Sequence, residues 1–196
     1  MWRSIFGNFG VRVLSALLNL GLVILFSQLT GAVGKGEQSL LLTSVAIITI
    51  FDSLVGGAAL VYLSSRYSWT QLIKASYAWV LVVSAFAFLI LEAVHVFETK
   101  YLLHIILLSA ISSVSSVHAS LLLGQQRLKA FNLVQILVPL LTFSTCVGQW
   151  LVNQPLDYIA ALYVSYLVAL LTSCIAIWRF FPQREQEKVG RKMIWQ

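Results

Sequence analysis

Six long apolar stretches alternate with short polar segments along this chain. They cover residues 9–29, 39–63, 72–91, 101–123, 131–152 and 158–181. A helix of about 20 residues, rising 1.5 Å per residue, crosses the ~30 Å hydrocarbon core of a bilayer. The pattern therefore predicts an all-α fold, a polytopic bundle of six transmembrane helices over residues 1–181. Residues 182–196 are expected to form a charged cytoplasmic tail.

The composition supports a membrane location. Hydrophobic residues make up 59% of the chain and charged residues 10%, whereas soluble domains have about 45–50% and about 25%. Long apolar runs without period-two alternation exclude a transmembrane barrel. Cys146 and Cys174 fall in different predicted helices without metal-ligand spacing, so we expect no disulfide between them.

Basic residues are distributed very unevenly between the two sides of the predicted bundle. Eleven of the 13 Lys and Arg residues lie on one side, and only Lys35 and Lys100 on the other. The eleven are Arg3, Arg12, Arg66, Lys74, Arg127, Lys129, Arg179, Arg184, Lys188, Arg191 and Lys192. Because cytoplasmic loops carry the excess of Lys and Arg, both termini are predicted to be cytoplasmic. The net charge of +6 thus has a membrane explanation, and no nucleic-acid partner is expected.

Asp52 lies at the centre of the second predicted span, SLLLTSVAIITIFDSLVGGAALVYL. A carboxylate at that depth costs about 2.5–3.5 kcal/mol on insertion scales, so it must face protein or water. Gly56 lies one turn further on the same helical face and allows another backbone to approach closely. The sequence therefore predicts a second helix, and a cavity, against this face. A carboxyl group that only joins two helices by hydrogen bonding is an equal alternative.

A polar stripe follows one face of the fifth predicted span. At steps of three or four residues it contains Asn132, Gln135, Pro139, Thr142, Cys146 and Gln149. Three amides on one face need several hydrogen-bond partners each, which favours a water-filled or substrate-facing surface. Pro139 is expected to kink this helix.

Other spans carry shorter polar stripes. The first span has Arg12 and Asn19 on its cytoplasmic half. The fourth has a face of Ser109, Ser112, Ser116 and Ser120, with Ser113, Ser115 and His118 nearby. Small hydroxyl residues are typical of dry helix contacts, and His104 and His118 favour packing over proton transfer. Arg12 and Asp52 either pair with each other, or leave Arg12 free to attract an anionic headgroup.

Catalytic signatures are missing from the sequence. There is no GxSxG, no HExxH and no Gly-rich phosphate loop, and the acidic residues are too few and scattered for a metal site. An integral-membrane transferase should show clustered Asp residues at cytoplasmic helix ends, and here these ends are basic. We therefore expect neither enzymatic activity nor a cofactor.

Two stretches resemble polysaccharide-biosynthesis flippases of the Wzx type, within the multidrug/oligosaccharidyl-lipid/polysaccharide exporter superfamily. The first stretch joins an Arg-bearing helix to LTGAVGKGE, FDSLVGG and the basic turn SSRY. The second, LLGQQRLKAFNLVQILVPLL, is similar to the loop between helices four and five of that family. The resemblance implies two six-helix bundles that face a central cavity, of which this chain would be the N-terminal half.

This resemblance also implies a function. Such proteins move lipid-linked oligosaccharides across the inner membrane by alternating access, often with ion coupling, and cavity cations bind pyrophosphate or acidic sugars. The candidate substrate-binding residues are Arg12, Asn19, Asp52, Asn132, Gln135 and Gln149. The implied partners are membrane lipid, the lipid-linked oligosaccharide, and a second six-helix half or a second copy of the chain.

The chain departs from the family in length. The family usually has twelve or more spans, and here GRKMIWQ is similar to the approach to a seventh helix. The sequence is therefore expected to be a fragment or truncated product, or else a natural half that dimerises. Two other functions remain open: a drug or cation exporter of the same superfamily, and a non-transporting membrane scaffold subunit.

Overall fold

The computed structural model describes the backbone of residues 2–64, 66–95, 99–153 and 157–194, and the side chains of residues 7–64, 66–95, 101–153 and 157–180. Within these ranges the chain is helical and contains no strand, so the predicted all-α class is confirmed. The helices are α1 (Trp2–Gly56), α2 (Ala58–Leu63), α3 (Trp69–Val94), α4 (Thr99–Gly124), α5 (Leu128–Leu151) and α6 (Tyr158–Ile194).

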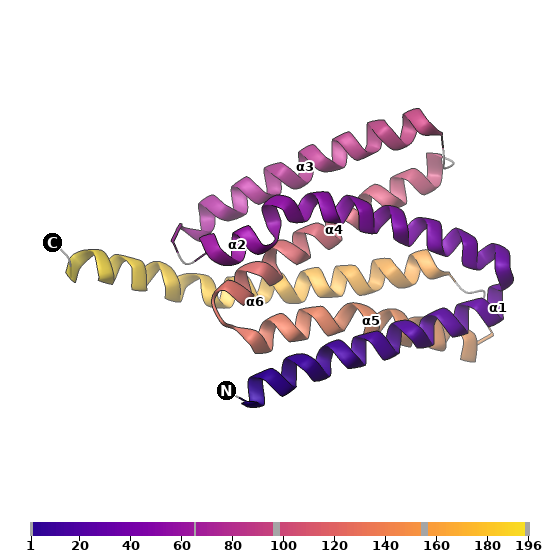
Figure 1. Ribbon diagram of the computed structural model, residues 1–196, viewed down its shortest axis with the longest axis horizontal. Helices are drawn as coiled ribbons and strands as arrows, with labels where there is room; N and C mark the ends of the chain where they lie inside the picture. Colours follow the sequence, from indigo (N-terminus) through magenta and orange to yellow (C-terminus); the bar gives the residue numbers. More distant parts are fainter. Residues whose placement is uncertain (1, 65, 96–98, 154–156, 195–196) are drawn as a thin grey trace.

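Helix α1 consists of two arms that meet at Gly31. Gly31 has φ 66° and ψ −166°, which is not helical, and a φ in this range is accessible mainly to glycine. The first arm ends there, and the second arm runs back across the molecule, so that the two arms diverge from the bend (Figure 1). The spans predicted at 9–29 and 39–63 imply a turn over the polar segment 30–38 between them. That extent was wrong, because one residue with positive φ redirects the chain and helical geometry resumes directly after it.

The last four predicted spans coincide in position with α3 to α6, and the first two lie within one helical segment. Five helical segments are long and apolar enough to cross a membrane, and the first of them, Gly7–Leu63, contains both arms of α1 together with α2. The other four are Trp69–Val94, Tyr101–Gly124, Leu128–Leu151 and Tyr158–Phe180. Helix α6 continues as a helix to Ile194, beyond the predicted span end at residue 181. A multi-pass membrane protein follows from these lengths and compositions.

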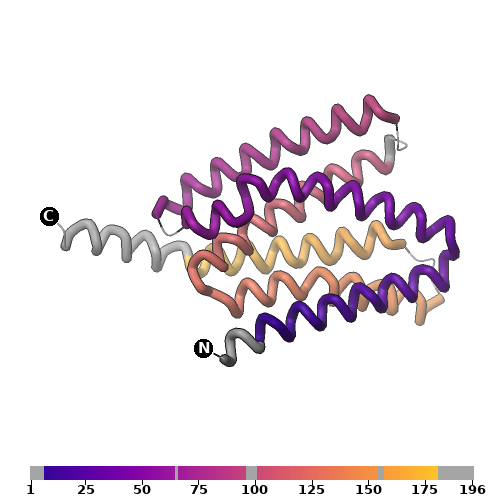
Figure 2. Tube along the Cα trace, in the orientation of Figure 1, coloured from indigo at the N-terminus to yellow at the C-terminus, as the bar shows by residue number. Residues whose placement is uncertain are grey.

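Helix α4 is the central element of the bundle. It packs against every other helix, and it is the most buried of the candidate spans. The tube in Figure 2 shows α3 and the second arm of α1 on one side of the molecule, with α5 and the first arm of α1 on the other. Residues that face a functional cleft are therefore expected on α4 and on the helices that flank it.

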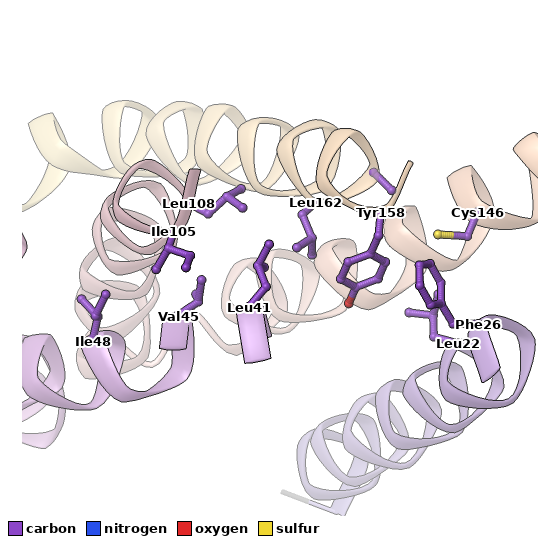
Figure 3. Close-up of a cluster of buried hydrophobic side chains, with 11 residues drawn as sticks. Leu22, Phe26, Leu41, Val45, Ile48, Ile105, Leu108, Cys146, Tyr158 and Leu162 are labelled. Carbon is purple, nitrogen blue, oxygen red and sulfur yellow. The ribbon is translucent and has the colours of Figure 1, made fainter. Parts of the chain in front are cut away.

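The larger apolar core joins both arms of α1 to α4, α5 and α6. Figure 3 shows Phe26 of the first arm beside Tyr158 of α6, where the ring centroids lie 5.1 Å apart in an edge-on arrangement. Leu41 and Val45 of the second arm belong to the same cluster, together with Ile105 of α4. This core holds both arms of α1 against α4, α5 and α6.

Two close approaches position the second arm and α2 against α4. A Cβ atom on Gly124 would lie 2.1 Å from Ser64 Oγ and 2.6 Å from the Val61 carbonyl oxygen, so only glycine fits there. A Cβ on Gly56 would lie 3.1 Å from Val117. The predicted helix against the Asp52–Gly56 face is thus α4, and this prediction is confirmed.

Helix α1 ends immediately after this contact. Gly57 has φ −93° and ψ −122° and separates α1 from the six-residue α2. The Gly57 amide still donates to the Ser53 carbonyl at 2.8 Å, but the Leu60 amide donates to Gly57 instead of Gly56. The second apolar stretch is therefore a broken helix, with the break about one turn beyond Asp52.

Candidate functional site

Asp52 is buried between the second arm of α1 and α4. Its side chain is 3% exposed, and the hydroxyl of Ser113 on α4 donates a hydrogen bond to Oδ2. The other carboxyl oxygen, Oδ1, is buried and has no hydrogen-bond partner among the residues that the structure describes. The carboxyl group is thus only half satisfied at a depth where such groups need full compensation.

A small hollow lies beside this carboxyl group. It has a volume of about 10 Å³ and is lined by Asp52 and by Thr49, Ser53, Gly56, Ser113, Ser116 and Val117. That volume is close to the minimum that holds one water molecule. The hollow beside Asp52 is therefore about the size of one water molecule.

A larger cleft opens directly beside the hollow. Its volume is about 360 Å³, within the usual range of about 300–1,000 Å³ for ligand pockets. The walls come from α1, α4, α5 and α6, namely Thr49, Ile50, Ser53, Ser112, Ser115, Ser116, Ala119, Val134, Gln135, Val138 and Tyr166. Seven of the eleven lining residues carry a hydroxyl, amide or phenol group, although most of the exposed lining is apolar. Thr49, Ser53 and Ser116 line both spaces, so the hollow is a side pocket of the cleft.

The predicted polar stripe of α5 is divided between different surroundings. Gln135 is exposed and lines the cleft, as a substrate-facing residue would. Asn132 is half-buried, and its Oδ1 atom is buried without a hydrogen-bond partner. Thr142 is buried and donates to Ser165 Oγ at 2.9 Å, and Cys146 is buried in the apolar core. Only the Gln135 end of the stripe therefore reaches the cleft.

Gln149 lies at the far end of α5. Its Oε1 atom accepts a hydrogen bond of 3.2 Å from the backbone amide of Asp157. Gln135 and Gln149 are 14 residues apart in sequence, which is about 21 Å along a helix. The structure gives Gln149 a local role next to the first turn of α6 and does not bring it to the Asp52 hollow.

Arg12 and Asn19 lie on the first arm of α1, and both are exposed. Neither lines the cleft beside Asp52. In the described part of the chain Asp52 is held by Ser113 and makes no ion pair with Arg12. The sequence left open whether Arg12 and Asp52 pair with each other. In the structure they are not paired.

A second buried polar group joins α3, α4 and α6. His118 is 2% exposed. Its Nε2 atom lies 2.5 Å from Tyr77 Oη, and its Nδ1 atom lies 2.8 Å from Ser173 Oγ. Both ring nitrogens are therefore hydrogen-bonded, and the predicted packing role of this histidine fits the geometry. His104 likewise bonds Tyr163 Oη at 3.0 Å.

Sequence reasoning missed the partner of Asp52. The serines of α4 were interpreted as dry helix contacts, and Ser109 fits that view because it is buried and bonds the Ile106 carbonyl. Ser113 instead bonds Asp52, and Ser112 and Ser116 line the cleft. The serines of α4 form two adjacent rows along the helix, and one of these rows had to face the second arm of α1. This was the signal that the sequence offered.

No family model matches this chain, and no curated protein or solved structure matches it either. The case for a function therefore rests on the geometry of the cleft and on the sequence resemblance described above.

Proposed function

We propose that this protein is the N-terminal half, or a natural half, of a transporter that flips a lipid-linked oligosaccharide across the inner membrane by alternating access. The observation that carries the proposal is the cleft of about 360 Å³, whose walls carry hydroxyl, amide and phenol groups among apolar surface. Helix faces that contact lipid are apolar, and hydroxyl and amide groups at membrane depth belong to protein contacts or aqueous cavities. A cleft that presents such groups between apolar spans offers hydrogen-bonding positions to a polar solute.

The topology is part of the proposal. The segment Gly7–Leu63 has 57 residues and would be about 85 Å long as one straight helix. Since that is far beyond the bilayer core, we propose that its two arms cross the membrane separately. The chain then crosses six times, with both termini in the cytoplasm, as the distribution of Lys and Arg predicts.

A broken helix supports a transport role further. Secondary transporters place discontinuous helices at their substrate and ion sites, where unwound backbone lines a cavity. Here α1 breaks at Gly57, about one turn from the buried Asp52, and Ser53 between them lines the cleft. The exposed amide of Gln135 faces the same cleft from α5 and suits hydroxyl-rich solutes such as sugars.

We assign Arg12 to binding the anionic end of the substrate. Arg12 has no carboxylate partner among the described residues and lies near the cytoplasmic end of the first arm. A guanidinium there suits the pyrophosphate of a lipid carrier, because charge-assisted hydrogen bonds to phosphate are strong and often bidentate. The second wall of the cavity would come from a second six-helix half or a second copy of the chain.

The test compares two tryptophan substitutions on α5. Gln135→Trp places a large side chain in the cleft, whereas Leu133→Trp changes a residue that is 50% exposed on the apolar surface. Both variants are expressed in cells that lack their own flippase, and appearance of the lipid-linked oligosaccharide on the outer leaflet is measured. We expect Gln135→Trp to reduce flipping at least about tenfold, which corresponds to about 1.4 kcal/mol, and Leu133→Trp to leave it nearly unchanged.

Two outcomes would contradict the proposal. If the unmodified protein supports no flipping when it is present with its second half, the oligosaccharide is the wrong substrate. If Gln135→Trp and Leu133→Trp behave alike at equal protein levels, the cleft is not the transport path. Reporter fusions after Arg127 and Lys100 test the topology separately, because they should report the cytoplasmic and external sides respectively.

A further inference from the structure

Exposed cations gather at one end of the helix bundle, where the chain passes from α2 to α3 and from α4 to α5 (Figure 1). The span of α6 also ends there, at Phe180. Five exposed basic residues lie on these segments, namely Arg66, Lys74, Arg127, Lys129 and Arg179. We call these five residues the basic end patch. None of them lines the cleft of the proposed function.

The exposed acids of the described residues lie at the opposite end of the bundle. Glu37 follows the Gly31 bend, Glu92 is in the last turn of α3, and Asp157 directly precedes α6. The remaining acid of the described residues, Asp52, is buried against Ser113. Positive charge is therefore concentrated at the patch, and a concentration of one sign of charge attracts a partner of the other sign.

Two turns that are distant in sequence pack together to form this patch. Gln125 Nε2 donates a hydrogen bond of 3.3 Å to the Ser64 carbonyl oxygen, and the close approach of Gly124 to Ser64 holds the turns together. Arg66 and Arg127 each follow this contact by two residues. The fold thus places an arginine from each turn on the same end of the bundle.

Both arginines are held against aromatic rings. The Cζ atom of Arg66 lies 4.7 Å from the centroid of the Tyr62 ring, and that of Arg127 lies 4.6 Å from the centroid of the Phe180 ring. These distances are typical of cation–π contacts. Such stacking uses the face of a guanidinium, whereas its N–H donors lie in the plane of the group. The two guanidinium groups are therefore oriented in advance, which lowers the entropy cost of binding an oxyanion.

The patch lies at the level where a membrane has its headgroups. One apolar span ends at Gly124, the next begins at Leu128, and another ends at Phe180, so these positions mark the edge of the hydrocarbon core. Exposed aromatic side chains occupy the same end of the bundle, with Tyr62 57%, Tyr67 54% and Trp178 80% exposed. Tyr and Trp are enriched at membrane–water interfaces. The phosphates nearest to the patch are thus those of lipid headgroups.

We propose that the basic end patch binds headgroups of anionic phospholipids through the guanidinium groups of Arg66 and Arg127, with Lys129 and Arg179 adding positive charge. A zwitterionic headgroup also carries a cation, which the patch repels, so anionic lipid is preferred. The position at the span ends favours lipid over an acidic protein, which would have to displace the headgroups to reach the same side chains. This binding does not depend on which solute uses the cleft, and a failed flipping assay would leave it standing.

The test counts bound lipids by native mass spectrometry of the purified full chain in detergent, with phosphatidylglycerol and phosphatidylcholine of identical acyl chains added in equal amounts. We expect phosphatidylglycerol to be retained at least about tenfold over phosphatidylcholine. The double variant Arg66→Gln/Arg127→Gln should reduce this preference at least about fivefold. The matched control Lys35→Gln/Lys100→Gln removes the same charge after the Gly31 bend and in the first turn of α4, and it should leave the preference unchanged.

Folding of each variant is checked by gel filtration and helical circular dichroism. If the double variant does not fold, Arg66→Gln and Lys35→Gln are compared in the same way. The proposal is overturned if the folded unmodified chain retains both lipids equally, which would favour an acidic protein as the partner of the patch. It is also overturned if the patch and control variants lose phosphatidylglycerol alike, or if inorganic phosphate at the same concentration displaces the lipid.

Discussion

Two buried polar groups meet α4 about one and a half turns apart, and they differ in how fully they are satisfied. His118 has partners on both ring nitrogens, Tyr77 from α3 and Ser173 from α6. The Asp52–Ser113 pair is only half complete, because Oδ1 has no partner in the described part of the chain. The first group joins three helices around a closed centre, whereas the second borders an open cleft. A satisfied buried group stabilises the bundle, and an incomplete one beside a cavity indicates a place for a ligand.

The largest effect on stability is expected from the closed group. His118→Ala leaves Tyr77 and Ser173 without their partner and creates a cavity, so it should reduce the free energy of unfolding by about 3 kcal/mol. His104→Ala is the matched control. His104 is half-buried with a single bond to Tyr163, and we expect a loss of about 1 kcal/mol. Unfolding titrations in detergent give both values. Equal losses of unfolding free energy in the two variants would contradict the view that His118 matters more because it has two partners.

Replacement of Asp52 should affect stability less than replacement of His118. Asp52→Asn keeps the shape of the side chain and a partner for Ser113, and it removes a buried charge. We therefore expect the free energy of unfolding to change by less than about 1 kcal/mol, or to rise. The same titration measures it. A loss as large as that of His118→Ala would mean that Asp52 is a structural group like the histidine.

Arg12 should have the smallest effect on this site. Since it makes no ion pair with Asp52 in the described residues, Arg12→Gln and Asp52→Asn should act independently on stability. Their effects should add to within about 0.5 kcal/mol in the double variant. Recovery of stability or protein level in the double variant, after a fall in both single variants, would show that the two groups pair.

Hydropathy predicted most of the fold because every helix that crosses a membrane must be apolar and long enough to span the hydrocarbon core. The helices α3 to α5 begin and end close to the predicted limits, and α6 begins at the predicted residue. The spacing of Asp52 and Gly56 also predicted a helix against their common face, and Val117 and Ser113 of α4 lie there. These features follow from helical periodicity alone, which the sequence displays directly.

Helical periodicity alone could not identify the residue that hydrogen-bonds Asp52. Serines occur on several faces of α4, and the rotation of that helix decides which one meets the carboxyl group. The break at Gly57 was equally hidden, since adjacent glycines also serve as simple contact residues. Gln149 was assigned to the substrate surface because it shares a stripe with Gln135, but the nearby Asp157 amide occupies it.

Aqueous access to the cleft tests the central claim most directly. Single cysteines at Ser116, which lines the cleft, and at Leu107, which is 45% exposed on the apolar surface of the same helix, are compared in a background without Cys146 and Cys174. A small charged thiol reagent is added to membranes in their native orientation and to permeabilised membranes. The account predicts that Ser116→Cys reacts at least about tenfold faster than Leu107→Cys, because a thiol reacts as the hydrated thiolate. Equal reaction at both positions, or protection of Ser116→Cys from both sides, would show that the cleft holds no water.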